Sequence, residues 1–418
     1  MTESATASGH QAGARDHTEV AAEERSPLMP TYNPPAVEFL RGEGPYLWDG
    51  DGKRHIDFLS GLAVTSLGHA HPAIAAAVSA QASRLLHVSN LYGTEHNGPV
   101  ATALDRLVGD GNPLGGQVFF CNSGAEANEA AIKLARRYAG PGRHVVVCAF
   151  QSFHGRTLAT LAATGQPQKW DAFQPLPEGF RHVIWDDLAE LEKNLDETVG
   201  AVFLEPVQGE GGVNPASAEY FQGVEALCRE RGILFMVDEV QTGLARTGRW
   251  FGFQHFGVSP DVIAMAKALG NGMPIGACWA KPEVASAFQP GDHATTYGGQ
   301  PLAASAARAV LETMQAIDAP ARAREAGEQL TAALLALPDV VAVRGLGLLL
   351  AAELDGLDAR SVASRCLAGG LVVNGVTPTA IRLAPPLIIE PAHIAEAMAI
   401  LGSVLAEERA ANRQEASS

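Results

Sequence analysis

Apolar and polar residues are distributed along the chain in three successive patterns. Residues 1–26 are small, polar and charged without a sustained apolar period, so they cannot bury enough surface to offset their ordering, and we expect a disordered tail. Residues 46–58 form two short runs around the sequence Asp49-Gly50-Asp51-Gly52, a pattern that predicts a β-hairpin. From about residue 71, helical patterns alternate with unbroken apolar runs.

Short unbroken apolar runs are typical of buried parallel strands joined by helical crossovers. Such strands are predicted at residues 118–120, 145–149, 199–204, 233–237 and 262–265. Helices are predicted at residues 72–86, 126–138, 217–231 and 301–317. The alternation predicts an α/β domain over residues 71–318.

The chain after residue 319 reads as a second, smaller α+β unit. Two helices are expected before a final helix that starts at residue 391, and strand patterns occur at residues 340–343, 348–352, 371–373 and 381–383. This unit spans residues 319–411, and residues 27–70, with the hairpin, read as the opening part of a small domain.

Composition and charge exclude several classes of protein. Of the 418 residues, 47% are apolar and only 18% are charged, which excludes disorder over most of the chain. The 44 glycines indicate many tight turns or close backbone approaches to a ligand. A formal charge of −16 has the wrong sign for binding nucleic-acid phosphates, so we expect no nucleic-acid partner.

Cysteine usage and hydropathy predict the compartment. The five cysteines are odd in number, far apart and mostly within apolar runs, so they read as reduced buried thiols and not as disulfides or a zinc site. No stretch approaches the roughly 18 apolar residues of a membrane helix, and the N-terminus lacks an apolar signal-peptide core. We therefore expect a cytoplasmic protein without metal or membrane partner.

Three of the predicted strands lead into ionisable residues, Glu205, Asp238 and Lys267. Ligands of open α/β sheets bind beyond the carboxyl ends of the strands, so these side chains are candidates for a site. A single strand-end carboxylate is more often a turn residue, and a lysine there often only extends to solvent. Lys267, however, follows a buried run without an adjacent acid, and desolvation of an amine favours the neutral nucleophile that a Schiff base requires.

The segment Ser123-Gly124-Ala125 links a predicted strand to a helix. Free N–H groups and the positive end of the helix dipole would meet there, which predicts a cradle for a phosphate or carboxylate. Helix capping alone also explains a Ser-Gly pair at such a turn. The segment lacks the glycine motifs that bind nucleoside triphosphates or dinucleotides.

Phe153 and Arg156 follow another predicted strand. An aromatic ring there can cover a planar cofactor and an arginine can grip a carboxylate, although core packing and a surface ion pair are the ordinary roles of such residues. Aldolase or decarboxylase chemistry would use Lys267 but needs neither the phosphate cradle nor Asp238. The four features together describe a site for pyridoxal 5′-phosphate.

On these residues the chain resembles the class III aminotransferases of pyridoxal-phosphate fold type I, and within that class it is most similar to the acetylornithine aminotransferases. The similar segments are 61–72 (GLAVTSLGHAHP), 87–90 (HVSN), 119–129 (FFCNSGAEANE), 152–156 (SFHGR), 204–212 (LEPVQGEGG), 238–243 (DEVQTG), 246–248 (RTG), 295–299 (TTYGG), 344–348 (RGLGL) and 381–386 (IRLAPP). The resemblance implies a mostly parallel central sheet in the large domain, and a small α+β domain built from both ends of the chain.

The resemblance also implies roles for the cofactor residues. Lys267 would form the Schiff base with the cofactor and move a proton between Cα and C4′, and Asp238 would keep the pyridine nitrogen protonated. The phosphate would be bound by Ser123, Gly124 and Ala125, together with Thr296 from the neighbouring subunit of a homodimer. Phe153 would stack on the ring and Gln241 would approach its hydroxyl.

Substrate roles follow from the same resemblance. Arg156 would hold the carboxylate remote from the reacting amine, and Thr295 is expected at the substrate. Glu210 would pair with Arg382 while an ω-amino donor is bound and release it for the α-carboxylate of glutamate or 2-oxoglutarate. Leu62 would line the entrance for an acylated chain.

The resemblance predicts transfer of the δ-amino group of N2-acetyl-L-ornithine to 2-oxoglutarate, giving N-acetyl-L-glutamate 5-semialdehyde and L-glutamate in arginine biosynthesis. Ornithine remains an alternative donor because Tyr32 falls near a position that ornithine aminotransferases use for the free α-amino acid. Succinylornithine, N-succinyl-diaminopimelate and 4-aminobutyrate are further alternatives, as is a non-catalytic, cofactor-binding regulatory protein. The chain departs from the acetylornithine pattern at Asn271, where a glycine is usual, and at Gln300, where an asparagine is usual.

Overall fold

The computed structural model describes residues 27–415, so the predicted tail at residues 1–26 lies outside the described part. The chain divides into two compact units, Met1–Glu38 and Phe39–Ser418. Residues 27–38 of the first unit consist of bends and irregular backbone. The helices, strands and cavities discussed below belong to the second unit.

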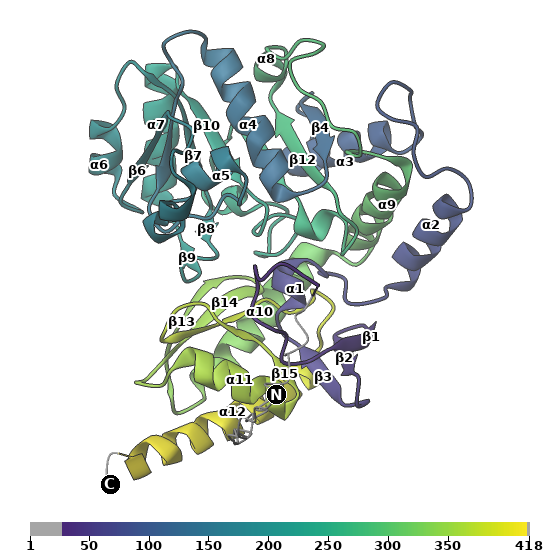
Figure 1. Ribbon diagram of the computed structural model, residues 1–418, viewed down its shortest axis with the longest axis vertical. Helices are drawn as coiled ribbons and strands as arrows, with labels where there is room; N and C mark the ends of the chain where they lie inside the picture. The colour runs from purple at the N-terminus through teal and green to yellow at the C-terminus, as the bar shows by residue number, and fades with distance from the viewer. Residues whose placement is uncertain (1–26, 416–418) are drawn as a thin grey trace, which may run out of the picture. The chain divides into compact units, whose positions relative to one another are not determined.

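The largest sheet of the second unit has seven strands (Figure 1). Its strands, in spatial order, are β4 (Gln117–Cys121), β12 (Gly276–Ala280), β11 (Val262–Met265), β10 (Leu234–Asp238), β7 (Val199–Leu204), β5 (Val145–Ala149) and β6 (Phe180–Val183). Only β12 is antiparallel to its neighbours. The predicted α/β class is therefore confirmed, and β6 and β12 are the strands of this sheet for which the sequence pattern gave no bounds.

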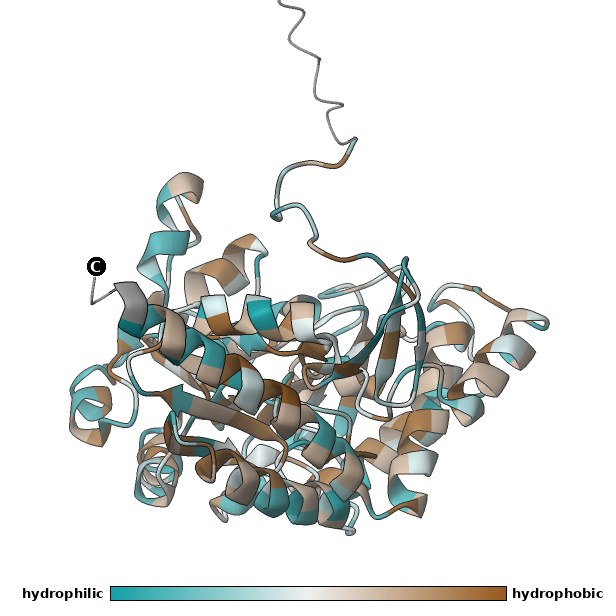
Figure 2. Cartoon of the chain, turned by 90° about the horizontal axis from the view of Figure 1, so that it is seen from below, coloured by the Kyte–Doolittle hydropathy of each residue, from teal (hydrophilic) through white to brown (hydrophobic). Residues whose placement is uncertain are grey.

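Both faces of this sheet are buried, which explains the unbroken apolar runs. Alternate residues of one strand point to opposite faces, so Val147 and Cys148 of β5 belong to two different apolar clusters. Helix α4 (Gly124–Ala139) covers one face with Ala131 and Ala135, and helix α7 (Ala218–Arg231) covers the other with Phe221 and Val224. Figure 2 shows the same division, with brown interior strands and outer helices that mix brown and teal.

Further helices surround the sheet. They are α2 (Pro72–Ala82), α3 (Asn97–Val108), α5 (Leu158–Ala163), α6 (Leu188–Lys193), α8 (Pro282–Ala285) and α9 (Pro301–Ala316). Helix α2 ends four residues before its predicted end, where the side chain of Gln81 donates a hydrogen bond to the carbonyl of Leu85. Helix α4 begins two residues earlier than predicted because Ser123 caps it by accepting from the N–H of Glu126 at 3.2 Å.

Two smaller sheets bring the ends of the second unit together. One contains β1 (Phe39–Glu43), β2 (Tyr46–Asp49), β3 (Arg54–Asp57) and β15 (Leu371–Val372), and the other contains β13 (Val340–Leu346), β14 (Leu349–Leu354), β17 (Ala380–Leu383) and β16 (Asn374–Gly375). The predicted hairpin is confirmed as β2 and β3, and β15 pairs with β3 in parallel. The strand pairing is compatible with a small domain from both chain ends, but the boundaries at residues 70 and 318 remain a prediction.

The remaining helices of this region are α1 (Ser60–Ala63), α10 (Ala319–Leu335), α11 (Ala359–Gly369) and α12 (Pro391–Glu415), and a short ribbon pairs β8 (Val207–Gln208) with β9 (Asn214–Pro215). Among residues 27–415, no helix combines the length and the apolar character that crossing a membrane requires. All five cysteines are buried free thiols.

Candidate active site

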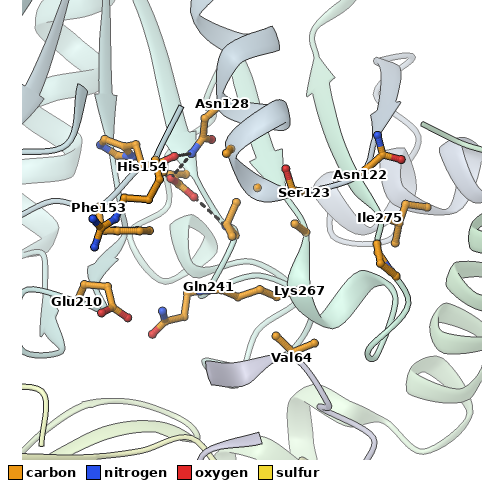
Figure 3. Close-up of a pocket in the computed structure, with 18 of the residues that line it drawn as sticks. Val64, Asn122, Ser123, Asn128, Phe153, His154, Glu210, Gln241, Lys267 and Ile275 are labelled. Atoms are coloured by element: carbon orange, nitrogen blue, oxygen red, sulfur yellow. Dashed lines mark hydrogen bonds and ion pairs between the residues drawn. The ribbon is translucent and has the colours of Figure 1, made fainter. Parts of the chain in front are cut away.

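The carboxyl ends of the parallel strands surround a cavity of about 410 Å³ (Figure 3). Strands β4, β5, β7, β10 and β11 each lead into a segment that lines it. The polar and charged lining residues are Asn122, Ser123, Asn128, His154, Arg156, Glu205, Glu210, Asp238, Gln241 and Lys267. Apolar surface is contributed by Val64, Phe153, Val240, Met273, Pro274 and Ile275, among others. This is the arrangement expected of a ligand site in an open α/β sheet.

Lys267 reaches the cavity from the turn that follows β11. Its backbone has a φ of +42°, a left-handed conformation that non-glycine residues adopt only when their surroundings hold them there. Burial lowers the pKa of the Lys267 amine to about 8, against the opposing attraction of Glu210. A neutral amine, the form that attacks a carbonyl carbon, is therefore accessible near physiological pH.

Asp238, the last residue of β10, is almost fully buried and is held by a polar network. One carboxylate oxygen, Oδ2, accepts from Asn128 Nδ2 at 2.8 Å and lies 2.8 Å from His154 Nδ1. The other oxygen accepts from the N–H of Val240 at 3.0 Å. The ring of His154 stacks on Phe203, with 4.5 Å between the centroids. These hydrogen bonds fix the orientation of the Asp238 carboxylate at the cavity wall.

The turn after β4 presents the N-terminus of α4 to the cavity. The first N–H groups of a helix have no acceptor within it, so Gly124 and Ala125 offer free donors beside the hydroxyl of Ser123. A Cβ atom on Gly124 would lie only 2.7 Å from Cγ1 of Val240. Glycine therefore allows this turn to pack directly against the residues that follow Asp238.

Two cations surround the ring of Phe153. The guanidinium of Arg156 lies 5.6 Å and the ammonium of Lys169 lies 5.1 Å from the ring centroid. The N–H of Phe153 donates to Glu205 Oε2 at 3.2 Å. Burial and, next, the charge of Asp238 raise the pKa of Glu205 well above its usual range, which favours the neutral form of this carboxyl at the cavity wall.

Glu210 and Arg382 form an ion pair at the edge of the cavity. Arg382 Nη1 donates to Glu210 Oε1 at 2.5 Å and to Gln241 Oε1 at 3.3 Å, while its Nε donates to Asn374 at 3.0 Å. Burial alone would raise the pKa of Glu210, but the attraction of Arg382 outweighs it and the pKa lies below the usual value. Arg382 is 1% exposed, so it is a buried cation whose charge is balanced by Glu210.

Several residues predicted for the site do not line this cavity. Thr295 and Thr296 line two other cavities, of about 970 and 480 Å³. Leu62 lies in α1 and is 41% exposed, whereas Val64 from the same segment lines the cavity. Tyr32 belongs to the first compact unit. Gln300 accepts a hydrogen bond from the N–H of Val88 at 3.1 Å and also lies outside the lining.

Asn128 and His154, the side-chain partners of Asp238, are among the site residues to which the sequence motifs assigned no role. Asn128 lies on the same helix face as the buried Ala131 and Ile132, so a polar residue among apolar neighbours was the available signal. His154 lies within the segment 152–156, but only the spatial proximity of β5 and β10 reveals its contact with Asp238.

The chain matches the family model "Aminotransferase class-III" over residues 29–405. It is 48% identical to the acetylornithine aminotransferase of Gloeobacter violaceus, with 91% of this chain and 96% of that protein aligned. It is 47% identical to the acetylornithine aminotransferase of Corynebacterium efficiens, with 91% and 95% aligned.

Solved structures with similar architecture include two aminotransferases. The N-acetylornithine aminotransferase of Stenotrophomonas maltophilia superposes with a TM-score of 0.79 and 33% identity, covering 90% of this chain and 98% of that one. An ornithine aminotransferase of Toxoplasma gondii, described with PLP at its active site, gives a TM-score of 0.86 and 32% identity, covering 92% and 93%.

The cavity fits pyridoxal 5′-phosphate by its donor set. The amine of Lys267, whose pKa is lowered, matches the aldehyde of the cofactor, and the buried carboxylate of Asp238 matches its pyridine nitrogen. The ring of Phe153 matches its aromatic face, and the free N–H groups at the N-terminus of α4 match its phosphate. Because the family model spans nearly the whole folded chain and full-length relatives are nearly half identical, this protein belongs to the class III aminotransferases, enzymes whose cofactor is pyridoxal 5′-phosphate.

Proposed function

We propose that this aminotransferase transfers the δ-amino group of N2-acetyl-L-ornithine to 2-oxoglutarate, forming N-acetyl-L-glutamate 5-semialdehyde and L-glutamate, and that it serves arginine biosynthesis. The observation that carries the proposal is the ion pair between Glu210 and Arg382 beside Lys267. Because Glu210 neutralises the charge of Arg382, an ω-amino group, whose carbon carries no carboxylate, can approach Lys267. The relatives named acetylornithine aminotransferase, at 42–48% identity, favour the acetylated donor among ω-amines.

In this proposal Lys267 and Asp238 act on the reaction itself. The cofactor, when bound, supplies a conjugated ring that takes up the electron pair released when the substrate C–H bond breaks. Lys267 Nζ would hold the cofactor in the resting enzyme and would then accept and return the proton taken from the substrate carbon. Asp238 keeps a proton on the pyridine nitrogen, and its hydrogen bonds from Asn128 and Val240 preserve its charge and orientation.

The other cofactor residues bind and orient. Ser123, Gly124 and Ala125 would bind the phosphate at the N-terminus of α4, Phe153 would cover the ring, and Gln241 would approach the ring hydroxyl. Figure 3 shows Asn128 and His154, with dashed lines at both; these are the side chains that contact the carboxylate of Asp238.

We propose a homodimer in which Thr296 of each subunit completes the phosphate site of the other. Support comes from the position of Thr295 and Thr296 outside the chain's own cavity. Apolar side chains around them are exposed in the single chain: Leu91 by 85%, Tyr92 by 70% and Tyr297 by 66%. Exposed apolar surface of this kind is typical of a subunit interface. We also propose a cytoplasmic location, which the five free thiols favour.

For the substrates, we propose that Arg156 binds the donor's remote carboxylate and that Arg382 binds the α-carboxylate of 2-oxoglutarate after Glu210 releases it. Thr295 would contact substrate from the dimer interface. Arg156 is exposed at the cavity and forms no ion pair with a carboxylate of the described chain, so its guanidinium is available. A bidentate arginine contact with a carboxylate is both strong and directional.

A panel of amino donors tests the choice of substrate. Purified holoenzyme with 2-oxoglutarate would be assayed for kcat/KM with N2-acetyl-L-ornithine, L-ornithine, N2-succinyl-L-ornithine, N-succinyl-diaminopimelate and 4-aminobutyrate. We expect the acetylated donor to give the highest value. Ornithine is the main competitor, since solved ornithine aminotransferases share this architecture, and its preference over the acetylated donor would contradict the proposal.

Single-turnover experiments should show that Arg382 and Glu210 affect the two half-reactions differently. Loss of a charge-assisted bidentate contact costs roughly 1.5–3 kcal/mol, which corresponds to a decrease in rate of roughly 10- to 160-fold. We expect Arg382→Ala to slow the reaction of the aminated enzyme with 2-oxoglutarate by that factor and the donor half-reaction much less. Glu210→Ala should weaken ω-amine donors because the uncompensated Arg382 repels the incoming ammonium. Equal losses in both half-reactions for Arg382→Ala would reduce this arginine to a structural residue.

The lowered pKa of Lys267 predicts a pH dependence of cofactor attachment. Below about pH 8 the amine is an ammonium ion that cannot attack the aldehyde, and above it the amine is neutral. The rate at which cofactor-free protein takes up the cofactor should therefore rise roughly tenfold per pH unit up to about pH 8 and then level off. A rise that continues to pH 10, as for an ordinary lysine, would contradict the lowered pKa.

A further inference from the structure

The side chain of Asn271 joins the loop that carries Lys267 to a segment far away in the sequence. Asn271 Oδ1 accepts from the N–H of Leu67 at 2.7 Å, and Asn271 Nδ2 donates to the carbonyl of Gly68 at 3.0 Å. The carboxamide thus satisfies the N–H of one residue and the carbonyl of the next. Asn271 lies four residues after Lys267 and is one of the two positions that depart from the acetylornithine pattern.

The loop on one side of this contact is strained. Both Lys267 and Asn271 have left-handed backbones, with φ of +42° and +46°. Within the loop, Gly270 donates to the carbonyl of Lys267 at 3.2 Å. Apart from asparagine and aspartate, non-glycine residues such as Lys267 disfavour this conformation, and contacts from outside the loop help to hold it. The carboxamide of Asn271 provides such a contact.

The segment on the other side is strained as well. Ser60, Leu62 and Ala63 have φ of +51°, +69° and +63°. The segment is held at its start by Asp57 Oδ1, which accepts from the N–H of Ser60 at 2.8 Å. At its far end stand Leu67 and Gly68, the residues that Asn271 contacts. Asp57 and Asn271 therefore hold this left-handed turn at its two ends.

The turn at residues 60–68 and the loop that carries Lys267 both contribute apolar residues to the wall of the cavity. Val64 comes from the turn, and Gly272, Met273 and Ile275 come from the continuation of the lysine loop. Figure 3 shows Val64 beneath the side chain of Lys267, with Ile275 to its side. The spacing between these apolar surfaces limits which chain can lie beside the amine of Lys267.

We propose that Asn271 is a positioning residue: its carboxamide clamps the lysine loop to the turn at residues 60–68 and thereby sets the apolar wall against which the amino donor packs. The clamp acts through Val64 and the residues 272–275 and does not touch the reacting atoms. The proposal rests on the assignment of this cavity to the amino donor, but not on the identity of that donor.

Asn271→Gly isolates the clamp because glycine adopts a φ of +46° without strain, so only the carboxamide is lost. In the holoenzyme we expect the Leu67 amide to exchange with deuterium at least roughly tenfold faster and the donor KM to rise roughly tenfold. We expect kcat to change less than about threefold, because the flexible side chain of Lys267 still reaches the site. The donor for this assay is whichever ω-amine the panel identifies.

Asp318→Gly is the matched control. Asp318 is an exposed left-handed residue, with φ of +49°, before α10, and its side chain makes no cap hydrogen bond. This variant should change neither Leu67 exchange nor the donor KM. Asn271→Gly indistinguishable from wild type in both measurements would overturn the proposal.

Asn271→Asp decides the matter if the glycine variant does not fold. Aspartate keeps an acceptor for the N–H of Leu67 but places a second oxygen against the carbonyl of Gly68, so an intermediate rise in donor KM is expected. A wild-type KM in this variant would overturn the proposal. A panel without any active ω-amine would contradict the proposed function instead, and Leu67 exchange would still report on the clamp.

Discussion

Replacement of Lys267 by alanine is expected to abolish transamination, with kcat reduced by roughly 10⁴-fold or more. The variant loses both the amine that attaches the cofactor and the group that moves the proton, and general acid–base catalysis alone contributes roughly 10²- to 10⁴-fold. Lys133 lies within α4, and Lys281 lies beyond β12 in an ion pair with Asp261, so neither can take over. Steady-state kinetics with N2-acetyl-L-ornithine and 2-oxoglutarate measures the loss.

Lys281→Ala is the control for this experiment, since it removes a lysine from outside the cavity lining and should leave kcat within about twofold. Borohydride reduction of the wild-type holoenzyme should fix the cofactor to the peptide that contains Lys267. Recovery of the cofactor on any other peptide would show that the lysine assignment is wrong.

The second large effect is expected for Asp238→Asn. The amide cannot hold a proton on the pyridine nitrogen by charge, so the ring becomes a poorer electron acceptor and kcat should fall by roughly 10³-fold. The shape of the side chain is preserved, and circular dichroism should show a normal fold. The acceptor for the N–H of Val240 also persists, because asparagine retains one carbonyl oxygen.

Asp261→Asn provides a matched carboxylate near the other end of β10. Asp261 Oδ2 accepts from the N–H of Phe235 at 2.9 Å, outside the cavity lining. This variant is expected to lower stability by about 1 kcal/mol and to leave kcat nearly unchanged. Nearly normal turnover by Asp238→Asn would mean that Asp238 is only a turn residue at the end of a strand.

The sequence pattern predicted the central fold because the sheet is buried on both faces. Strands β5, β7 and β11 have the predicted bounds, because every residue in them is apolar or glycine. Such runs can be recognised without knowing which strands lie beside them. Strand β6 was not predicted, because Arg181 and His182 interrupt its apolar pattern. Helix α3 was missed because Gly98 and Pro99 mark its first turn as a loop.

The candidate site was predictable where each residue follows a strand, because parallel strands end at one edge of the sheet. Asp238, Lys267 and the turn at Ser123 were found in this way. The partners of Asp238 were not, because Asn128 and His154 lie 110 and 84 residues away from it in the sequence. The role of Asn271 was equally hidden, since Leu67 lies 204 residues before it. Contacts of this range depend on the folded topology and leave no local pattern.

The non-catalytic alternative that the sequence left open is not favoured by the assembled site. A protein that only bound the cofactor would have no need for the buried ion pair between Glu210 and Arg382. When this pair opens, the buried guanidinium of Arg382 loses its counter-charge, which is energetically unfavourable. The pair is understandable if one pocket must accept first an ω-amine and then an α-keto acid.

Isotope transfer tests the central claim most directly. Purified holoenzyme would be incubated with N2-acetyl-L-ornithine labelled with ¹⁵N at the δ-amine and with unlabelled 2-oxoglutarate, and the glutamate formed would be analysed by mass spectrometry. We predict ¹⁵N-labelled glutamate in an amount equal to the N-acetyl-L-glutamate 5-semialdehyde produced. Unlabelled glutamate, or no glutamate while Lys267 carries the cofactor, would contradict the account.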